Sequence, residues 1–278
     1  MEFNKIKVST QTYIVQSNIS NVDLIKLTDC FEPTDVLINL KYKTVIKGKL
    51  KLIKRKIKKP PTTKTFLNCV TLSVFVYDKT INVKIFNNGV FQLTGCKYHN
   101  HAIKCIKIVI ALLHEHKCFL CESKPIVYLT SVMRNIDFDL SFKIDREAMA
   151  TYVHNNTEYR VPPLTKGYMG IKIKIPLENI DDLPVTCILF DKDTALPIDE
   201  HLMIYKTLMT EVIKDLKKLK KARFISISVF QNGKVLMSGP DVCYQEKYYK
   251  WFMQFVTENR VKISYISPIT TKKTFKLQ

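Results

Sequence analysis

The string IFNNGVFQLTG at residues 85–95 returns as VFQNGKVLMSG at residues 229–239, and this repeat constrains the fold more than any other feature. Each copy has a phenylalanine, Phe86 or Phe230, three residues before a glycine, and ends on a second glycine six residues later. An Asn-Gly pair between apolar runs is typical of a tight β-hairpin. Each copy therefore predicts strand, turn and strand, and a unit built twice predicts two halves related by a pseudo-twofold axis.

The two halves predict the same order of elements around these hairpins. Period-two alternation marks the strands, and apolar residues at helical spacing mark the helices. Ser20 or Asn21 is expected to cap the first helix, and Asp145 its counterpart. In the first half the elements are expected at residues 7–16, 21–30, 36–45, 67–77, 81–86, 90–94 and 102–113. In the second half they are expected at 126–142, 145–153, 170–175, 226–230, 234–238 and 244–256.

The second half carries additional residues. The offset between the copies grows from about 123 residues at the first helix to 144 at the hairpin. We place the extra residues near 197–221, where the spacing is helical. Residues 170–175 alternate as residues 36–42 do, and are expected to be their counterpart. The predicted boundaries are a first repeat at 1–120 and a second repeat, with the helical insertion, at 121–278.

Composition favours a folded chain with a polyanionic partner. With 278 residues and 46% hydrophobic residues, the chain can bury a sizeable core. Its net charge of +19 favours nucleic acid or an anionic membrane surface, although lysine runs at 47–64 and 214–223 are also compatible with a merely solvated surface. The sequence has no membrane-spanning run and its start lacks the apolar core of a signal peptide, so we expect an intracellular protein whose eight cysteines are thiols.

The sequence gives no sign of catalysis. It contains no P-loop, no GxGxxG and no HExxH motif, so we expect no catalytic residues and no cofactor. One candidate metal motif is H-x-H-x-C-x-x-C at His114, His116, Cys118 and Cys121. Four ligands so close in sequence rarely close one tetrahedron, and no second CxxC exists. Free cysteines at a helix end are the favoured interpretation, and we expect no metal.

Four strings carry a resemblance to a known family: KIFNNGVFQLTGCK (84–97), MRNIDFDLSFKIDREAM (133–149), GYMGIKIKI (167–175) and VFQNGKVLMSG (229–239). With two copies of an F-x-x-G-x-x-x-x-[ST]-G hairpin, the chain resembles the TATA-binding protein family, and in detail its divergent members in large DNA viruses of eukaryotes. The resemblance covers most of the chain except 47–66 and 197–221. It implies an α+β saddle of two pseudo-symmetric repeats, with a curved antiparallel sheet and helices on its convex face.

The resemblance also implies a function. The concave sheet would bind a widened minor groove, and aromatic wedges would enter base steps. AT-rich sites would be preferred because pyrimidine–purine steps deform most easily. The implied partners are double-stranded promoter DNA, a transcription factor IIB-like protein and a viral RNA polymerase, with no membrane. The implied location is the host nucleus or a cytoplasmic viral factory, with packaging in the virion as a further option.

The resemblance assigns roles to single residues. Phe86 and Phe230 match one wedge in each half, and Tyr168 matches the second wedge of the second half. Asn135 matches a minor-groove asparagine, and its first-half mate falls near Gln11. The remaining implied DNA contacts are the hydroxyl residues Thr94 and Ser238, the apolar Leu236, and the phosphate-facing lysines Lys41, Lys43 and Lys174.

Departures from the family pattern leave alternatives open. The second wedge of the first half falls at Asp35 or Val36, where no aromatic stands. Gln92 and Ser228 replace apolar sheet residues. These changes favour an alternative in which the saddle is a protein-docking module that has lost DNA binding. Binding of RNA or single strands by base stacking ranks last, because the aromatic motif of an RNA-recognition fold is missing.

Overall fold

The structure is a computed structural model that describes residues 2–48, 68–119, 121, 123–164, 167, 169–177, 179–211 and 223–265. The first half comprises η1 (Phe3–Lys5), β1 (Val8–Ser17), α1 (Leu24–Cys30), β2 (Leu37–Tyr42), β3 (Val45–Gly48), β4 (Cys69–Val76), β5 (Lys79–Phe86), β6 (Phe91–Cys96) and α2 (His99–Glu115). The second half comprises β7 (Ile126–Asp139), α3 (Arg146–Asn156), β8 (Gly170–Leu177), β9 (Pro184–Phe190), β10 (Pro197–Ile204), α4 (Tyr205–Glu211), β11 (Arg223–Phe230), β12 (Lys234–Gly239), α5 (Val242–Glu258) and α6 (Arg260–Ile263).

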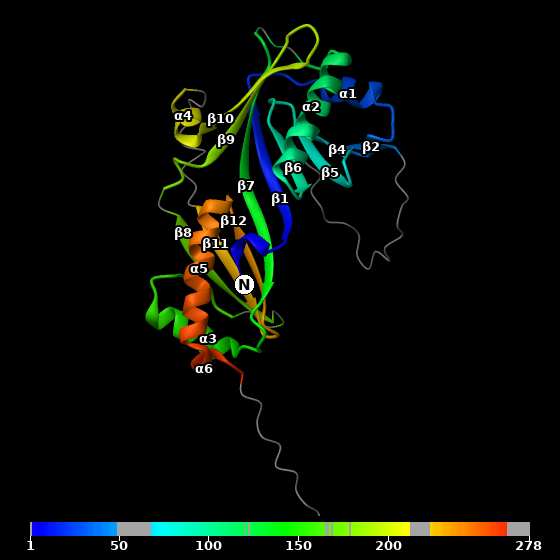
Figure 1. Cartoon of the computed structure of the whole chain (residues 1–278). Helices are drawn as coiled ribbons and strands as arrows, with labels where there is room; N and C mark the ends of the chain where they lie inside the picture. Colours follow the sequence, from blue (N-terminus) through cyan, green and yellow to red (C-terminus); the bar gives the residue numbers. More distant parts are fainter. Residues whose placement is uncertain are drawn as a thin grey trace, which may run out of the picture.

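The strands of the described residues form one antiparallel, twelve-stranded sheet. Its order is β3-β2-β4-β5-β6-β1-β7-β12-β11-β8, while β9 pairs with β7 and β10 pairs with β9. The long strands β1 and β7 lie side by side at the centre and join the two halves (Figure 1). The expected fold class, an α+β saddle with a curved antiparallel sheet and helices on one face, is confirmed.

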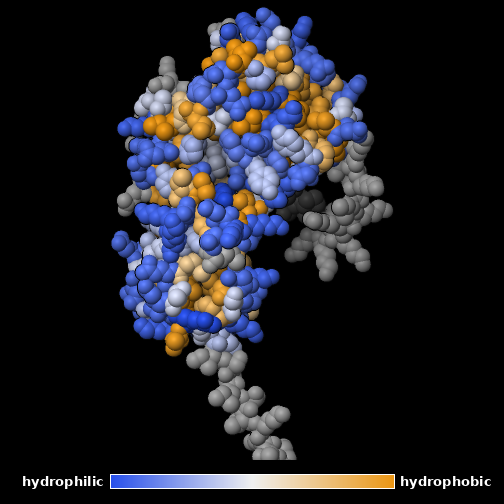
Figure 2. Space-filling model, viewed as in Figure 1, coloured by the Kyte–Doolittle hydropathy of each residue, from blue (hydrophilic) through white to orange (hydrophobic). Residues whose placement is uncertain are grey.

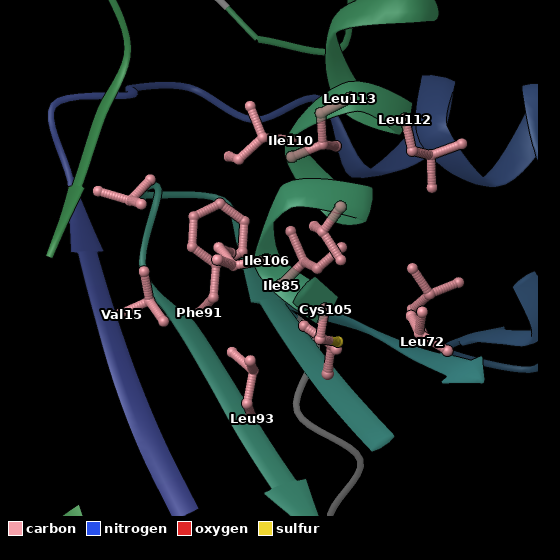
Figure 3. Packing of buried hydrophobic residues seen from close by; sticks show 14 of the residues in the cluster. Val15, Leu72, Ile85, Phe91, Leu93, Cys105, Ile106, Ile110, Leu112 and Leu113 are labelled. Atoms are coloured by element: carbon pink, nitrogen blue, oxygen red, sulfur yellow. The ribbon is translucent and has the colours of Figure 1, made fainter. Parts of the chain in front are cut away.

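The first core forms between α2 and the sheet of the first half. Alternating residues of β5 and β6, such as Ile85 and Leu93, are fully buried there. Figure 3 shows Ile106 and Ile110 of α2 lying over Phe91 and the neighbouring strands. Full burial of such side chains contributes about 1.5–3 kcal/mol each, so this interface fixes which sheet face is covered.

The second core repeats this arrangement with α5. Phe252 and Val256 of α5 pack against Ile227 and Met237 of the strands. Phe3 of η1 joins this core, with its ring centroid 5.4 Å from that of Tyr249. The chain start is thereby anchored to the second half, near the middle of the molecule in Figure 1.

Equivalent residues make equivalent bonds in the two halves. Asp23 caps α1 and Asp145 caps α3, and each carboxylate accepts hydrogen bonds from the second and third residues that follow it. The prediction for Asp145 is confirmed, whereas the first helix begins later than expected and is capped by Asp23 rather than by Ser20 or Asn21. The Phe86 carbonyl accepts from Gly89 N at 3.2 Å, and the Phe230 carbonyl accepts from Gly233 N at 2.9 Å.

The halves differ beyond their hairpins. β8 pairs with β11 along its full length, which is the place that β4 occupies beside β5. Residues 170–175 are therefore the counterpart of β4, and their expected match with residues 36–42 is wrong. The neighbour that β2 provides in the first half is reduced in the second to a single bridge between Arg160 and Lys174. Alternation alone could not separate the two matches, because both strands share the same period.

The insertion is a hairpin followed by a short helix. The predicted helical insertion near 197–221 begins as strand β10, and only α4 is helical among its described residues. β9 pairs with residues 126–130 of β7, a stretch of β7 that extends past β12. His99 at the start of α2 ties this hairpin to the first half, because its Nε2 lies 2.8 Å from Thr186 Oγ1 and its Nδ1 lies 3.2 Å from Tyr13 OH. Burial lowers the pKa of His99, which keeps the ring neutral at neutral pH.

Two expectations about chemistry can be compared with the structure. All eight cysteines lie in the described part of the chain and are free thiols. Among the described residues no three His, Cys, Asp or Glu side chains gather in an arrangement that could hold a metal ion. His114 instead directs Nε2 to the carbonyl of Lys192 at 3.1 Å.

No helix within the described ranges is long and apolar enough to cross a membrane. Most of the two lysine runs lies outside those ranges.

Candidate nucleic-acid interface

The candidate interface is the face of the sheet that α2 and α5 do not cover, which we call the open face. In β5 the odd positions Ile81, Val83 and Ile85 are buried under α2, so the even positions project to the open face. Residues that pair directly across strands project to the same side, so the register extends this assignment over the whole sheet.

In the first half the open face is polar and carries cations. Two rows of paired residues cross it: Lys41–Thr71–Lys84–Gln92–Ile14 and Asn39–Ser73–Asn82–Thr94–Thr12. Neither row contains an acidic residue. Lysines and neutral hydrogen-bonding groups are the set that a phosphate backbone and groove edges require.

In the second half the open face is more mixed. Two rows cross it: Thr10–Asn135–Ser238–Ser226–Lys174 and Asp137–Leu236–Ser228–Lys172. The structure thus brings Lys41, Thr94, Asn135, Lys174, Leu236 and Ser238 onto one face, as the resemblance implied. It also places the exposed carboxylate of Asp137 among them, which the sequence interpretation did not consider.

Two asparagine side-chain oxygens on the open face are unpaired among the described residues. The Oδ1 atoms of Asn39 and Asn135 are buried and have no hydrogen-bond partner within the described residues. An unpaired buried polar atom costs about 1–3 kcal/mol. Asn135 lies on the central strand β7 and Asn39 on β2, so the two are not equivalent positions of the two halves. A ligand on the open face that carries a hydrogen-bond donor would satisfy either oxygen.

The two predicted wedges lie at opposite corners of the open face. Phe86 ends β5 and Phe230 ends β11, and both side chains are half-buried rather than enclosed in a core. Four strands lie between β5 and β11, namely β6, β1, β7 and β12. Every neighbouring pair along this path is antiparallel. β5 and β11 therefore run in opposite directions, so their carboxyl ends lie on opposite sides of the sheet.

A wide apolar hollow surrounds Phe230. Its volume is about 1210 Å³, and it lies over the ends of β7, β11 and β12. Its lining includes Phe230, Met169, Leu236, Asp137, Lys234 and Tyr265. Apolar side chains exposed in a concavity of this size mark a contact surface for a partner.

The register identifies a second apolar residue at this corner. Gly170 pairs with Phe230 as Cys69 pairs with Phe86. Gln231 N donates to the Met169 carbonyl at 3.0 Å, and Asn87 N donates to the Asn68 carbonyl at 3.4 Å. Met169, with 58% of its surface exposed, is thus the counterpart of Asn68. Met169 was not predicted as a site residue from the sequence. Its position directly before Gly170 would have identified it if β8 had been matched with β4.

Two predicted wedge positions need comment. The assignment of the missing first-half wedge to Asp35 or Val36 is wrong, because the Val36 carbonyl accepts from Phe75 N at 2.7 Å, at the end of β4 remote from Cys69. By the register that matches Asn68 with Met169, the counterpart of Tyr168 is residue 67. Residue 67 and Tyr168 both lie outside the described residues.

One predicted DNA contact, Gln11, is not on the open face. Gln11 is 9% exposed, and its Oε1 accepts a hydrogen bond from Tyr13 OH on the helix-covered side. Thr12 pairs with Thr94 as Asn135 pairs with Ser238, so Thr12 is the true mate of Asn135. A slip of one residue along a strand reverses the face, which explains the error. Lys43 lies in the β2–β3 turn, with Nζ 4.9 Å from the centre of the Tyr42 ring.

Comparison with known proteins agrees with the resemblance. No family model matches the chain. The chain is 33% identical over 132 residues to a TATA-box-binding protein-like protein of Acanthamoeba polyphaga mimivirus, a match that covers 42% of this chain and 36% of that protein. It is 21% identical over 205 residues to the uncharacterized protein 335L of Invertebrate iridescent virus 6, covering 69% and 61%. Neither match spans two thirds of the relative.

A solved structure of the Methanococcus jannaschii TBP superposes with a TM-score of 0.48 at 14% identity, covering 91% of this chain and 98% of that one. The resemblance predicted from the repeated hairpins is confirmed by the mimivirus match: this chain is similar to a divergent viral protein of the TATA-binding-protein-like class.

Proposed function

We propose that the open face binds the minor groove of AT-rich double-stranded promoter DNA, and that the chain is a viral transcription initiation factor. It would act without catalysing a reaction, by recruiting a transcription factor IIB-like protein and a viral RNA polymerase. Its place of action would be inside the host cell, in the nucleus or a cytoplasmic viral factory. The similarity to a viral TATA-box-binding protein-like protein supports this class of function.

The observation that carries the proposal is the placement of Phe86 and Phe230. Two half-buried apolar rings lie at opposite corners of one sheet face, so a duplex that crosses the face diagonally would meet both. Between them lie hydroxyl and amide side chains that can reach the N3 and O2 acceptors of A·T pairs. Unstacking costs a few kcal/mol per step, and contact with the sheet between the kinks offsets it.

Electrophoretic shifts on two duplexes of equal length test the proposal. One duplex is AT-rich with central TA steps, and the other contains only G·C pairs; both are titrated at the same salt concentration because phosphate contacts are salt-sensitive. We expect the AT-rich duplex to bind at least about tenfold more tightly. Equal affinity for the two duplexes would exclude minor-groove recognition by the open face.

Charge substitutions on the open face have opposite expected effects. Lys172→Gln removes a cation and should weaken DNA binding about threefold to tenfold near 0.1 M salt, while Asp137→Asn removes a repulsive carboxylate and should strengthen it by a similar factor. Both residues are exposed and end the same row. Titrations by fluorescence anisotropy measure both. Lys104→Gln on α2 and Asp193→Asn in the β9–β10 turn are matched controls, and weaker binding by Asp137→Asn would place the DNA elsewhere.

The second candidate function is a protein-docking saddle that does not bind DNA. Asp137 and Asp139 on the second half of the open face favour it, because carboxylates repel phosphates. The polar Asn68 at the first-half corner favours it too. A chain that fails to bind either duplex, yet folds normally, would support this alternative.

A further inference from the structure

Residues 179–200, which include the β9–β10 hairpin, have the opposite charge to the chain as a whole, although the lysine run at 214–223 follows them. The chain as a whole carries +19, yet between residues 179 and 200 a single lysine, Lys192, stands against six acidic residues. These are Asp181, Asp182, Asp191, Asp193, Asp199 and Glu200. A segregated acidic patch on a basic protein repels nucleic acid and attracts cationic groups. This segment therefore favours a cationic partner, whereas the cations of the open face favour an anionic one.

The outer strand of the insertion is an open sheet edge. β10 pairs with β9 on one side, and no other described strand pairs with it. Seven of its eight residues are exposed, the exception being Met203. An uncovered edge presents unpaired backbone N–H and C=O groups to a further strand. Natural proteins blunt such an edge with charged side chains, especially lysines, with proline or with bulges. β10 has no lysine, and its protection consists of Pro197, a register shift between Pro197 and Asp199, and the carboxylates of Asp199 and Glu200.

Apolar side chains line this edge. Leu202 is 72% exposed and Ile198 is 49% exposed, and Leu196 and Ile204 beside them are exposed as well. In Figure 2 hydrophobic atoms interrupt the hydrophilic surface at the upper left, over the region that Figure 1 labels β10 and α4. Large apolar side chains gathered on an edge strand mark an interaction surface.

The polar residues of β10 are already held in place. Glu200 Oε2 accepts from Lys107 Nζ of α2 at 2.7 Å, and Asp199 Oδ2 lies 2.7 Å from His201 Nδ1. The Lys107–Glu200 pair links the hairpin to α2, whereas the Asp199–His201 contact lies within β10. A partner strand would meet a preformed edge, which reduces the ordering cost of binding.

We propose that β10 is a docking edge for an extended segment of a partner protein in which cationic and apolar residues alternate. The partner would add a strand to the sheet beside β10, its apolar side chains covering Leu202 and Ile198 and its cations facing the acidic residues of the insertion. This inference does not depend on DNA binding by the open face.

A second copy of the chain fits this edge less well. Two β10 strands related by a twofold axis through their centre would place Asp199 opposite Leu202 and Glu200 opposite His201. Leu202 of each copy would then face a carboxylate, and the two acidic hairpins would repel each other. Nucleic acid is disfavoured by the same acidic residues. A cationic strand is thus the occupant that the charges select.

A peptide titration tests the proposal on the full chain. The probe is a fluorescein-labelled peptide of about ten residues that alternates lysine and valine, followed by anisotropy; the control peptide has glutamate in place of lysine. We expect the lysine peptide to bind, and Leu202→Lys and Asp199→Lys each to weaken it at least tenfold. Val261→Lys is the matched control, since Val261 is an apolar α6 residue that is 85% exposed.

The remaining outcomes decide against the proposal. Absence of binding to the lysine peptide, equal binding of the glutamate peptide, or an equal loss in Val261→Lys would overturn it. Sedimentation that shows a dimer of the unmodified chain, converted to a monomer by Leu202→Lys, would assign the edge to a second copy instead. Far-ultraviolet circular dichroism and binding to the AT-rich duplex confirm that each variant is folded, because neither β10 residue lies on the open face.

Discussion

Replacing Phe230 by alanine is expected to weaken binding to an AT-rich duplex by about 10- to 100-fold and to reduce the DNA bend. Phe230 stands at a corner of the open face beside the exposed Met169, over an apolar hollow of about 1210 Å³. Loss of the ring removes the wedge that would hold an unstacked base step open. Anisotropy titrations measure the affinity, and energy transfer between dyes at the two duplex ends measures the bend.

Phe86→Ala is expected to have the smaller effect of the two wedge substitutions. Its corner holds Asn68 where the other corner holds Met169, so less apolar surface supports a kink there. The matched control is Tyr77→Ala, because this exposed tyrosine lies beside His101 of α2, with ring centroids 5.7 Å apart. Unchanged DNA affinity in both phenylalanine variants, with the fold retained, would favour the docking saddle over the DNA-binding one.

Gly89→Ala and Gly233→Ala are each expected to lower the free energy of unfolding by about 2–4 kcal/mol. Both glycines have positive φ, +75° and +88°. A Cβ at residue 89 would lie 1.9 Å from the Ile19 carbonyl oxygen, and one at residue 233 would lie 2.2 Å from the Phe142 carbonyl oxygen. The backbone of each hairpin must therefore shift, which also moves Phe86 or Phe230. Urea denaturation followed by circular dichroism measures the change.

Gly167→Ala separates backbone strain from the collision. Gly167 has a φ of +82°, but no atom lies within 4 Å of the position of its Cβ. This variant is expected to lose only about 1 kcal/mol, the cost of the left-handed conformation for an L-residue. Equal losses in the three variants would show that the contacts with residues 19 and 142 do not matter for stability.

Much of the fold was predictable because its signals are local. The Asn-Gly hairpins after Phe86 and Phe230, the Asp145 cap and the alternating strands each depend on a few neighbouring residues. The family resemblance named Thr94, Asn135, Leu236 and Ser238 as DNA contacts, and the register of the strands places them on one face. The resemblance then supplied a function that composition could only restrict to a polyanionic partner.

The wrong predictions share one physical cause: the sequence of a single strand does not determine which distant strand pairs with it, or in which register. The alternation of residues 170–175 fits a counterpart of β2 and a counterpart of β4 equally well. Because these residues were matched with β2, Met169 was not identified. Gln11 and Thr12 differ by one position, and only the register with β6 and β7 decides which of them reaches the open face. Residues 197–204 form a strand because β9 provides a partner for them.

The sequence by itself determined the repeated hairpins, the charge and the candidate wedges. The tertiary structure alone decided that Phe86 and Phe230 lie at opposite corners of one face, and that an acidic edge strand stands apart from that face. The physical reason is that side-chain periodicity is set within a strand, whereas direction, register and exposure are set by the strands and helices packed against it.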